Sequence, residues 1–383
     1  MFKFTMDFFA FLFSALFWLS AAVVVYAFFL FPVLVWALAI RLRCHASRSD
    51  GLKSVTLIIP FYNEADRIGA KIENCLALDY PPGQIEFLFI SDGSSDGGEE
   101  VVNACEDPRV RLLELGTRRG KSAALNEGVG DAKGEIIAFS DVGGEIDGSA
   151  MKSVVRYFHD DQVGCVCGTY RGAATTGRDI AKLAAGYLGF EMQLRTWESN
   201  IWTAVGGTGA LLVMRRQDFT PLPEGLLNDD FVLAARLAAE GKRVMYEPEA
   251  RIDELTAPGS AKILRRRARI SYGNWQMLSC LPQVRSWRSR FAVWVFVSHK
   301  LLRMILPIPL VVLWVGLGFL SPVLFWLLTI CLVAMLAFGG LCMRINPRLI
   351  EDHSLGAIPL ILLSLGAVCV GTLRYFRRGE VEW

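Results

Sequence analysis

Two long apolar runs enclose a middle of mixed composition, and this arrangement constrains the fold more than any other feature. The first run, residues 8–40, is almost uncharged, and the second, from about 291 to 373, is nearly continuous in Leu, Val, Ile and Phe. Because about 20 apolar residues cross a bilayer, both runs can contain spanning helices. The hydrophobic share of 53% is also high for a soluble protein. We therefore expect a membrane protein with a soluble middle domain.

The N-terminal segment, residues 1–44, is expected to form one tilted transmembrane helix. Two helices and a turn would need about 40 residues or more. Arg41, Arg43 and Arg48 follow the apolar run, so the positive-inside rule places its C-terminal end in the cytoplasm. A signal peptide would have a shorter apolar region and a small-residue cleavage site.

The C-terminal segment, residues 286–383, is expected to hold about three transmembrane helices, divided near Ser321 and at residues 343–353. Three spans after a cytoplasmic middle would place the arginines beyond residue 373 outside, against the positive-inside rule. Two explanations stay open. Either the proline-containing segment 298–309 is re-entrant or interfacial, or acids near the C-terminus weaken the charge signal.

The middle region, residues 45–285, alternates short apolar runs with helical patterns. Four runs have strand character and end in polar residues: SVTLIIP, IEFLFISD, VRLLEL and EIIAFSD. This alternation predicts a βαβ series with a mostly parallel sheet. Ligands bind beyond the carboxyl ends of the strands in such sheets. The residues that follow the strands are therefore candidates for a site.

Polar side chains follow three of these strands. Asn63 and Glu64 come after the first strand, Asp92 ends the second, and Asp141 ends the fourth. A single such tip is often an ordinary turn and helix cap, but three neighbouring tips would converge on one crevice. Lys121 begins a helical pattern, where a cation and backbone N–H groups together suit a diphosphate. A solvated basic turn would have the same pattern.

Two further segments carry unusual charge. Asp229 and Asp230 stand side by side at the expected start of an amphipathic helix, where they and Asn228 could also serve as simple caps. Residues 258–280 predict a basic amphipathic helix, with cations at three- and four-residue spacing on one side. Such a helix beside membrane spans is typical of one that lies on anionic lipid.

Seven segments, in order, resemble the family 2 inverting glycosyltransferases with membrane-embedded termini, the group that includes cellulose, chitin and hyaluronan synthases. They are LIIPFYNEADRI, FISDGSSDG, RRGKSAALNEG, EIIAFSD, GGTGALLVMRR, NDDFVLAARLAAEGKRVMYEPEA and RRRARISYGNWQML. The resemblance implies a GT-A nucleotide-diphospho-sugar transferase domain of α/β class, with transmembrane helices at both ends. It also implies a hexosyl- or N-acetylhexosaminyltransferase that uses a divalent metal, Mg²⁺ or Mn²⁺.

The resemblance assigns roles to the residues around the nucleotide. Asp92 would contact the nucleobase, Lys121 would lie near the nucleotide, and the pocket would be lined by Pro60, Tyr62, Asn63 and Glu64. Asp141 matches the first acid of the Asp-x-Asp element, which holds the metal and the diphosphate. Gly143 replaces the second acid, so Asp141 would hold the metal with phosphates and water, or with Glu145 or Asp147 as a substitute.

The resemblance also assigns the catalytic residues. Asp230 matches the general base that takes a proton from the acceptor hydroxyl. Asp229 would raise the pKa of Asp230 by like-charge repulsion, bind the acceptor or cap the helix, whereas the helix N-terminus favours the ionised forms.

Four further positions would contact the donor: Gly207, Thr208, Arg266 and Arg269. The glycine loop with Gly207 and Thr208 would lie near the donor sugar. Arg269 matches the diphosphate-binding arginine of the Gln-x-x-Arg-Trp element. Arg266 and Ile270 replace the Gln and the Trp of that element, which leaves acceptor handling and processivity open.

These observations predict an inverting transferase in a bacterial inner membrane, multi-pass and with its catalytic domain in the cytoplasm. It would move a sugar from a nucleotide-sugar donor, with a UDP-sugar favoured, to a polysaccharide or lipid-linked acceptor. Its other partners would be the lipid bilayer and polysaccharide-assembly proteins, and no nucleic acid. Three alternatives stay open: a non-processive transferase onto a polyprenyl-linked acceptor, a weakly active subunit of an assembly machine, and a channel or transporter with a regulatory nucleotide domain.

Overall fold

A mixed eight-stranded sheet forms the centre of the computed structural model, which describes residues 2–42, 44, 46–171, 179–254, 260–345 and 357–377. The strand order is β3-β2-β1-β4-β7-β6-β8-β5. The strands are β1 (Val55–Phe61), β2 (Ile85–Ser91), β3 (Val110–Glu114), β4 (Ile136–Phe139), β5 (Gly144–Ile146), β6 (Val163–Arg171), β7 (Leu212–Arg215) and β8 (Arg243–Glu254).

The four strands that the sequence predicts are β1 to β4, and they pair in parallel. The other half of the sheet differs from the prediction of a mostly parallel sheet. β7 is antiparallel to β4 and to β6, and β5 is antiparallel to β8, while β6 and β8 are parallel. The sheet is therefore mixed, and its parallel half gathers the carboxyl ends of β1, β2 and β4 at one edge.

Helices cover both faces of the sheet because each central strand is apolar on both sides. On one face, Ile58, Leu88 and Ile90 pack against α5 (Lys121–Asp131) and α8 (Asp229–Ala239). On the other face, Leu57 and Phe87 pack against α3 (Ala65–Leu76) and α6 (Ala150–Val155). Shorter helices are α4 (Gly98–Asn103), η2 (Pro82–Gln84), η3 (Arg156–His159), η4 (Arg216–Asp218) and η5 (Val284–Ser286).

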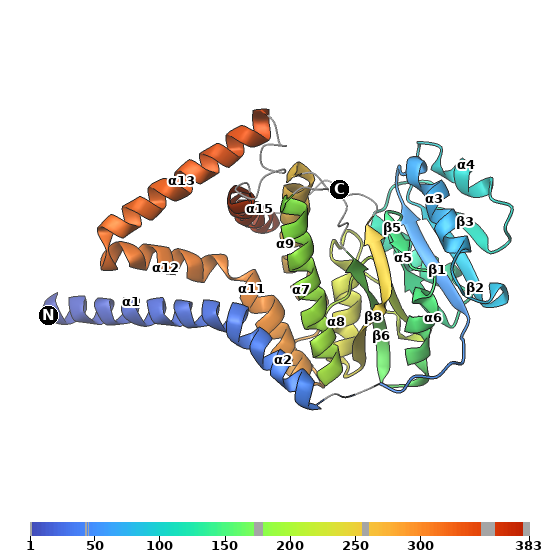
Figure 1. Cartoon of the computed structure of the whole chain (residues 1–383), viewed down its shortest axis with the longest axis horizontal. Helices are drawn as coiled ribbons and strands as arrows, with labels where there is room; N and C mark the ends of the chain where they lie inside the picture. The colour runs from blue at the N-terminus through green and yellow to red at the C-terminus, as the bar shows by residue number, and fades with distance from the viewer. Residues whose placement is uncertain are drawn as a thin grey trace.

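Two longer helices, α7 (Asp179–Ile201) and α9 (Ser260–Cys280), lie between the sheet domain and the apolar helices (Figure 1). The basic helix that the sequence predicts at 258–280 is α9. α2 (Phe31–Leu42) packs on α7 through the buried side chains of Phe31, Val35 and Leu194. The apolar N-terminal segment is thus anchored to the domain through α7.

The apolar helices extend away from the sheet domain (Figure 1). The first consists of α1 (Phe2–Val25), the π-helical η1 (Tyr26–Leu30) and α2, and its stretch Phe11–Leu42 is long and apolar enough to cross a membrane. The others are α10 (Arg290–Val295), the π-helical η6 (Phe296–Leu301), α11 (Leu302–Met304), α12 (Pro307–Leu320), α13 (Pro322–Ile345) and α15 (Ala357–Phe376).

A bend of 55° separates Arg290–Met304 from Pro307–Leu320. This break falls within 298–309, the segment that the sequence marks as irregular. In the described parts of the chain, one helix is long and apolar enough to cross a membrane, or two if the bent pair counts as one span. α13 and α15 contribute shorter apolar stretches, so the three predicted C-terminal spans stay a prediction.

Candidate active site

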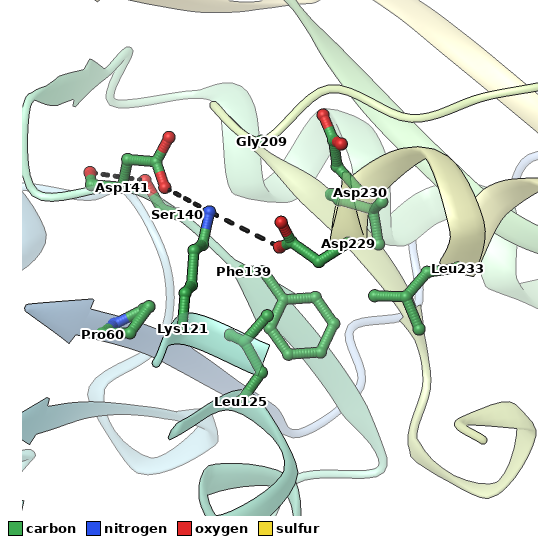
Figure 2. Close-up of a pocket in the computed structure, with 11 residues that line it drawn as sticks. Pro60, Lys121, Leu125, Phe139, Ser140, Asp141, Gly209, Asp229, Asp230 and Leu233 are labelled. Atoms are coloured by element: carbon green, nitrogen blue, oxygen red, sulfur yellow. Dashed lines mark hydrogen bonds and ion pairs between the residues drawn. The ribbon is translucent and has the colours of Figure 1, made fainter. Parts of the chain in front are cut away.

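A small pocket lies at the carboxyl edge of the parallel strands (Figure 2). Its polar lining comes from the end of β4, the first residue of α5, the loop before β7 and the start of α8. The lining residues are Pro60, Lys121, Leu125, Phe139, Ser140, Asp141, Gly209, Leu212, Asp229, Asp230 and Leu233. The fold therefore brings together Pro60, Lys121, Asp141 and both acids of α8, all of which the family resemblance places in the site.

Lys121 stands between two carboxylates. Its Nζ lies 2.7 Å from Asp141 Oδ1 and 3.4 Å from Asp229 Oδ2. Burial lowers the pKa of Lys121, but the charges of Asp141 and Asp229 outweigh burial and raise this pKa above its ordinary value. Lys121 is therefore a permanent cation at the centre of the pocket, suited to a phosphate group.

The two acids of α8 point in different directions. Figure 2 shows the Asp229 carboxylate turned toward Lys121 and the Asp230 carboxylate turned away from it. The pKa of Asp229 is raised to about 6. Burial is the main cause; Lys121 opposes it, and the neighbouring charge of Asp230 raises the pKa further. Asp230 is half-buried, and its Oδ1 accepts a hydrogen bond of 2.7 Å from the backbone N–H of Phe231. Asp229 and Asp230 can therefore have different functions in the pocket.

The alternative interpretation of this segment is that Asn228 and the two acids only cap α8. The side chain of Asn228 does not act as such a cap. This N-cap residue makes no side-chain hydrogen bond to its own helix. Its Nδ2 donates instead to Ile270 O at 3.2 Å and to Asn274 Oδ1 at 2.9 Å, both on α9. Asn228 therefore joins α8 to α9 and leaves the acids to face the pocket.

A larger cleft of about 540 Å³ opens beside this pocket, within the usual size range of ligand sites. Six cationic side chains contribute to its lining: Arg67, Arg118, Lys121, Lys262, Arg266 and Arg269. Three acids, Glu64, Asp92 and Asp141, line it as well. This excess of positive charge suits a ligand with several negative charges, and α9 supplies half of the cations.

Arg67 and Arg118 are cleft residues that the sequence analysis missed. The guanidinium of Arg118 lies 4.0 Å from the centre of the Tyr62 ring. Arg67 lies 3.5 Å from Glu64, and burial raises the pKa of Glu64 while Arg67 lowers it. Two features of the sequence could have indicated these residues. Arg118 belongs to a pair of arginines directly before Gly120, and Arg67 follows Glu64 by three residues, a spacing that allows an ion pair on a helix.

The side chains of Asn63 and Asp92 accept hydrogen bonds from the backbone of other loops. Asn63, with a φ of 52°, accepts a hydrogen bond of 2.9 Å from the backbone of Ser95 and lines neither pocket. Asp92 is 5% exposed and accepts hydrogen bonds from the backbone of Arg119 and Gly120. Asn63 therefore lies outside the lining of the small pocket and of the cleft, and its contact with a nucleotide stays a prediction. Contact of Asp92 with a nucleobase stays a prediction.

The glycine loop, residues 206–209, lies against Asp230 and close to Asp141. A Cβ at Gly207 would lie 2.5 Å from the carbonyl oxygen of Asp230, so Gly207 packs on the back of α8, and Thr208 is 5% exposed. Neither residue lines the small pocket or the larger cleft. Gly209 does, and a Cβ there would lie 3.3 Å from Asp141 Oδ2 and 3.7 Å from Asp230 Oδ2.

Lys71 is another residue that sequence analysis missed. It is 2% exposed on α3, and its Nζ donates to Ser140 Oγ at 2.9 Å and to the carbonyl of Gly144. Burial lowers the pKa of Lys71. Because these two partners flank Asp141 in the chain, Lys71 fixes the turn that presents this acid. A lysine in a helical pattern carries no sign of this role.

Mg²⁺ or Mn²⁺ would find few protein ligands in this site. Among the described residues, no group of three His, Cys, Asp or Glu side chains could hold a metal ion. Asp141 offers one carboxylate, and Gly143 lines the cleft in place of a second acid. Glu145 and Asp147, the expected substitutes, line neither pocket. The residues therefore fit a cation that takes most of its ligands from a diphosphate and water.

Comparison with known families decides the class of this chain. Residues 56–219 match Glycosyl transferase family 2, and residues 186–342 match Glycosyl transferase family group 2. The two matches together extend from residue 56 to residue 342, so the chain contains family 2 glycosyltransferase domains. The predicted family and the predicted enzyme class are thus confirmed.

Curated relatives of this glycosyltransferase take part in polysaccharide synthesis. The poly-beta-1,6-N-acetyl-D-glucosamine synthase of Staphylococcus aureus strain MSSA476 is 26% identical over 234 residues, which cover 60% of this chain and 56% of that protein. The succinoglycan biosynthesis protein ExoO of Rhizobium meliloti is 39% identical over 92 residues, which cover 24% and 26% of the two chains. The match therefore spans about half of the first relative's length.

A solved structure shares the fold of the glycosyltransferase. The mannosyltransferase PcManGT from Pyrobaculum calidifontis, solved in complex with GDP-Man and Mn²⁺, has a TM-score of 0.66 to this chain. It is 21% identical and covers 95% of this chain and 100% of its own. This likeness confirms the GT-A type of α/β fold.

Proposed function

We propose that this glycosyltransferase moves a sugar from a nucleotide-sugar donor to an acceptor hydroxyl, with inversion and with Asp230 as the general base. One observation carries the proposal: Lys121, Asp141, Asp229 and Asp230 converge on a pocket that opens into a cationic cleft of about 540 Å³. A nucleoside diphosphate fits the charge of the cleft. The sugar would lie in the cleft at the edge of the small pocket, between the diphosphate and the base.

Each residue then has a step in the reaction. Asp230 accepts the proton of the acceptor hydroxyl while the oxygen bonds to the anomeric carbon and the bond from that carbon to the diphosphate breaks. Lys121, with Arg266 and Arg269 from α9, stabilises the negative charge that develops on the leaving diphosphate. Asp229 holds Lys121 in place and leaves Asp230 to meet the acceptor.

Asp141 would hold Mg²⁺ or Mn²⁺ together with the donor. The cation would supply charge stabilisation to the diphosphate. Support comes from the Asp141 carboxylate at the cleft and from the Mn²⁺ and GDP-Man named for PcManGT. We keep a UDP-sugar as the favoured donor, beside a GDP-sugar, because one curated relative is named a poly-beta-1,6-N-acetyl-D-glucosamine synthase and another a succinoglycan biosynthesis protein.

The acceptor in this proposal is a growing polysaccharide or a lipid-linked sugar. The enzyme would be a multi-pass protein of a bacterial inner membrane, with residues 1–44 and 286–383 in the membrane and residues 45–285 in the cytoplasm. The basic helix α9 would lie at the interface, where acceptor lipid and donor meet. Product length separates a processive enzyme from one that makes a single transfer.

The test uses purified enzyme in detergent with Mg²⁺ or Mn²⁺, a panel of UDP-, GDP- and dTDP-sugars, and native lipid extract. Release of the nucleoside diphosphate is measured for wild type, Asp230→Asn and the exposed control Asp50→Asn. We expect metal-dependent release with one donor. Asp230→Asn should lower the rate by about 10²-fold or more, since general bases contribute about 10²–10⁴-fold.

Binding separates catalysis from donor recognition. Asp230→Asn should keep its affinity for the nucleoside diphosphate within a few-fold, because the base acts in the transition state. Equal rates for Asp230→Asn and wild type would remove Asp230 from the mechanism. A wild type that binds the nucleotide and turns over no donor would favour the weakly active subunit.

A further inference from the structure

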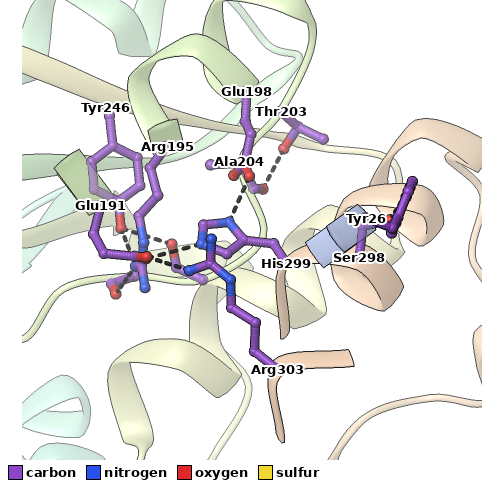
Figure 3. A network of polar contacts seen from close by, with 12 residues as sticks. Tyr26, Glu191, Arg195, Glu198, Thr203, Ala204, Tyr246, Ser298, His299 and Arg303 are labelled. Carbon is purple, nitrogen blue, oxygen red and sulfur yellow. Dashed lines mark hydrogen bonds and ion pairs between the residues drawn. The ribbon is translucent and has the colours of Figure 1, made fainter. Parts of the chain in front are cut away.

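The loop behind Asp230 is held by two buried side chains outside the pocket. Tyr246 on β8 donates from its OH to Gly206 O at 2.9 Å. Arg195 on α7 donates from Nη1 to Gly207 O at 2.9 Å and to Tyr246 OH at 2.7 Å (Figure 3). Two successive carbonyls of one loop are thus fixed by one connected pair of donors.

The position of this loop decides the shape of the pocket. Gly206 has a φ of 131°, and a Cβ there would lie 2.6 Å from the Phe231 ring. Gly207 lies against the Asp230 backbone, and Gly209 lies between the Asp141 and Asp230 carboxylates. A displacement of the loop would therefore change both the space between the two acids and the support of the base.

Arg195 is connected in turn to a cluster of buried charges. Glu191 and Glu198 lie on the same helix, α7, and both interact electrostatically with Arg195. His299 bridges the two acids, with Nε2 2.9 Å from Glu191 and Nδ1 2.6 Å from Glu198. Arg303 also pairs with Glu191 (Figure 3). Glu198 is fully buried.

This cluster joins α7 to the helix Arg290–Met304, which precedes the 55° bend. His299 lies in η6, a π-helical segment, and such segments are frequent at functional sites. The neighbouring Ser298 Oγ lies 2.8 Å from the OH of Tyr26 in η1, the other π-helical segment. The N-terminal apolar helix is therefore joined by a polar contact to η6, the segment that carries His299.

We infer that Arg195 and Tyr246 are positioning residues that fix the loop Gly206–Gly209 against Asp230. His299 influences the position of this loop indirectly, through Glu191, Glu198 and Arg195. The kinetic part of this inference rests on the proposed function. The structural part does not, because it concerns the order of the loop. A base held by a rigid loop reacts faster, since a small misplacement of reacting groups costs a large factor in rate.

The central test compares two buried tyrosines. Tyr246→Phe removes the hydroxyl that contacts Arg195 and Gly206. Tyr80→Phe is the matched control, since Tyr80 is 4% exposed and its OH donates to Lys53 O at 2.6 Å, outside the site. We expect Tyr246→Phe to lower kcat by about tenfold with the donor KM within about twofold. Tyr80→Phe should keep both constants.

Hydrogen–deuterium exchange gives a readout that needs no activity. Peptides that contain Gly206–Gly209 should exchange faster in Tyr246→Phe than in wild type or Tyr80→Phe, because the loop opens more often. Arg195→Lys, which keeps the charge without the guanidinium fork, should retain more kcat than Arg195→Met. Equal kcat and equal exchange in the two tyrosine variants would overturn the inference.

The far end of the connection has its own pair of variants. His299→Gln removes the bridge between the two acids, whereas His159→Gln removes only a contact with Gly51 O, at 2.7 Å and at the surface. We expect lower kcat and faster loop exchange in His299→Gln alone. If His299→Gln only lowers thermal stability, the part assigned to His299 is wrong.

Activity and positioning can fail separately. If wild type turns over no donor, the proposed function fails, and the exchange of the loop alone decides the inference. Faster exchange in Tyr246→Phe but not in Tyr80→Phe would then still support it. Unchanged exchange would overturn it whatever the activity of the wild type.

Discussion

At the scale of single residues, Asp229 combines burial, a nearby lysine and a neighbouring acid. Asp229 is 6% exposed, and its Oδ2 lies 3.4 Å from Lys121 Nζ. Its folded-state pKa of about 6 exceeds the ordinary value of 3.8. Between these values the folded protein keeps a proton that the unfolded chain has lost. Stability therefore falls as the pH rises through this window.

We predict that Asp229→Asn removes this pH dependence. A shift of about two pKa units corresponds to about 2–3 kcal/mol, so wild type should lose about that much relative to the variant from about pH 4 to about pH 7. Thermal unfolding of both proteins across this range measures the difference. Asp50→Asn, at an exposed position, should follow wild type at every pH. Parallel curves for wild type and Asp229→Asn would contradict the shifted pKa.

The positions of site residues were predictable from sequence where they follow a strand or begin a helix of the parallel sheet. Asp141 and Lys121 stand at a strand end and a helix start, so their meeting follows from the topology. Asn63 shares such a position, but its side chain bonds to the next loop instead. Lys71 and Tyr246 act from a helix and a strand interior, where the sequence pattern indicates only a core. Their roles depend on tertiary contacts.

At the scale of elements, α15 sets the position of the basic helix α9. Ser271 Oγ donates to Val368 O at 2.8 Å, and Trp275 Nε1 donates to Thr372 Oγ1 at 3.1 Å. Gly371 allows the close approach, because a Cβ there would overlap the carbonyl oxygen of Ala268. α9 carries half of the cations of the cleft, so the C-terminal helix would affect the donor binding that we propose for this cleft.

We predict that Gly371→Val weakens donor binding. The valine forces α15 away from α9, and a loss of about 1.4 kcal/mol in donor affinity would raise the donor KM about tenfold. Gly366→Val is the matched control on the same helix, since nothing lies within 4 Å of a Cβ there. Its KM should equal that of wild type. A change in thermal stability alone in Gly371→Val would mean that α15 merely packs on α9.

The sequence predicted those helices and strands that a local residue pattern determines. β1 to β4 follow from apolar runs separated by helical patterns, and α9 follows from its spaced cations. The antiparallel direction of β7 has no local signal, because chain direction depends on where the preceding α7 leaves the sheet. β5 has only three residues and gains its place from pairing with β8. The π-helical segments likewise have no pattern that distinguishes them from α-helix.

At the scale of the whole molecule, large apolar side chains remain exposed on the helices that leave the domain. Phe11 is 72% exposed, Trp18 68%, Phe319 76% and Val323 72%. Contiguous exposed apolar surface of this kind marks a membrane or partner contact. Hydropathy predicted the long apolar helix near the N-terminus, whereas the C-terminal spans stay a prediction, because their number depends on the break before Pro307.

We predict that the protein stays in the membrane fraction after both a high-salt wash and an alkaline carbonate wash. A protein held only by the basic face of α9 would be released by salt, because screening weakens its attraction to anionic lipid. Helices buried in lipid are insensitive to salt, because their transfer rests on apolar area. A double variant, Lys262→Gln with Arg265→Gln, isolates the contribution of α9 and should leave membrane retention unchanged. Release of the wild type by salt alone would show that the exposed helices α1, α12 and α13 contact a partner instead of a bilayer.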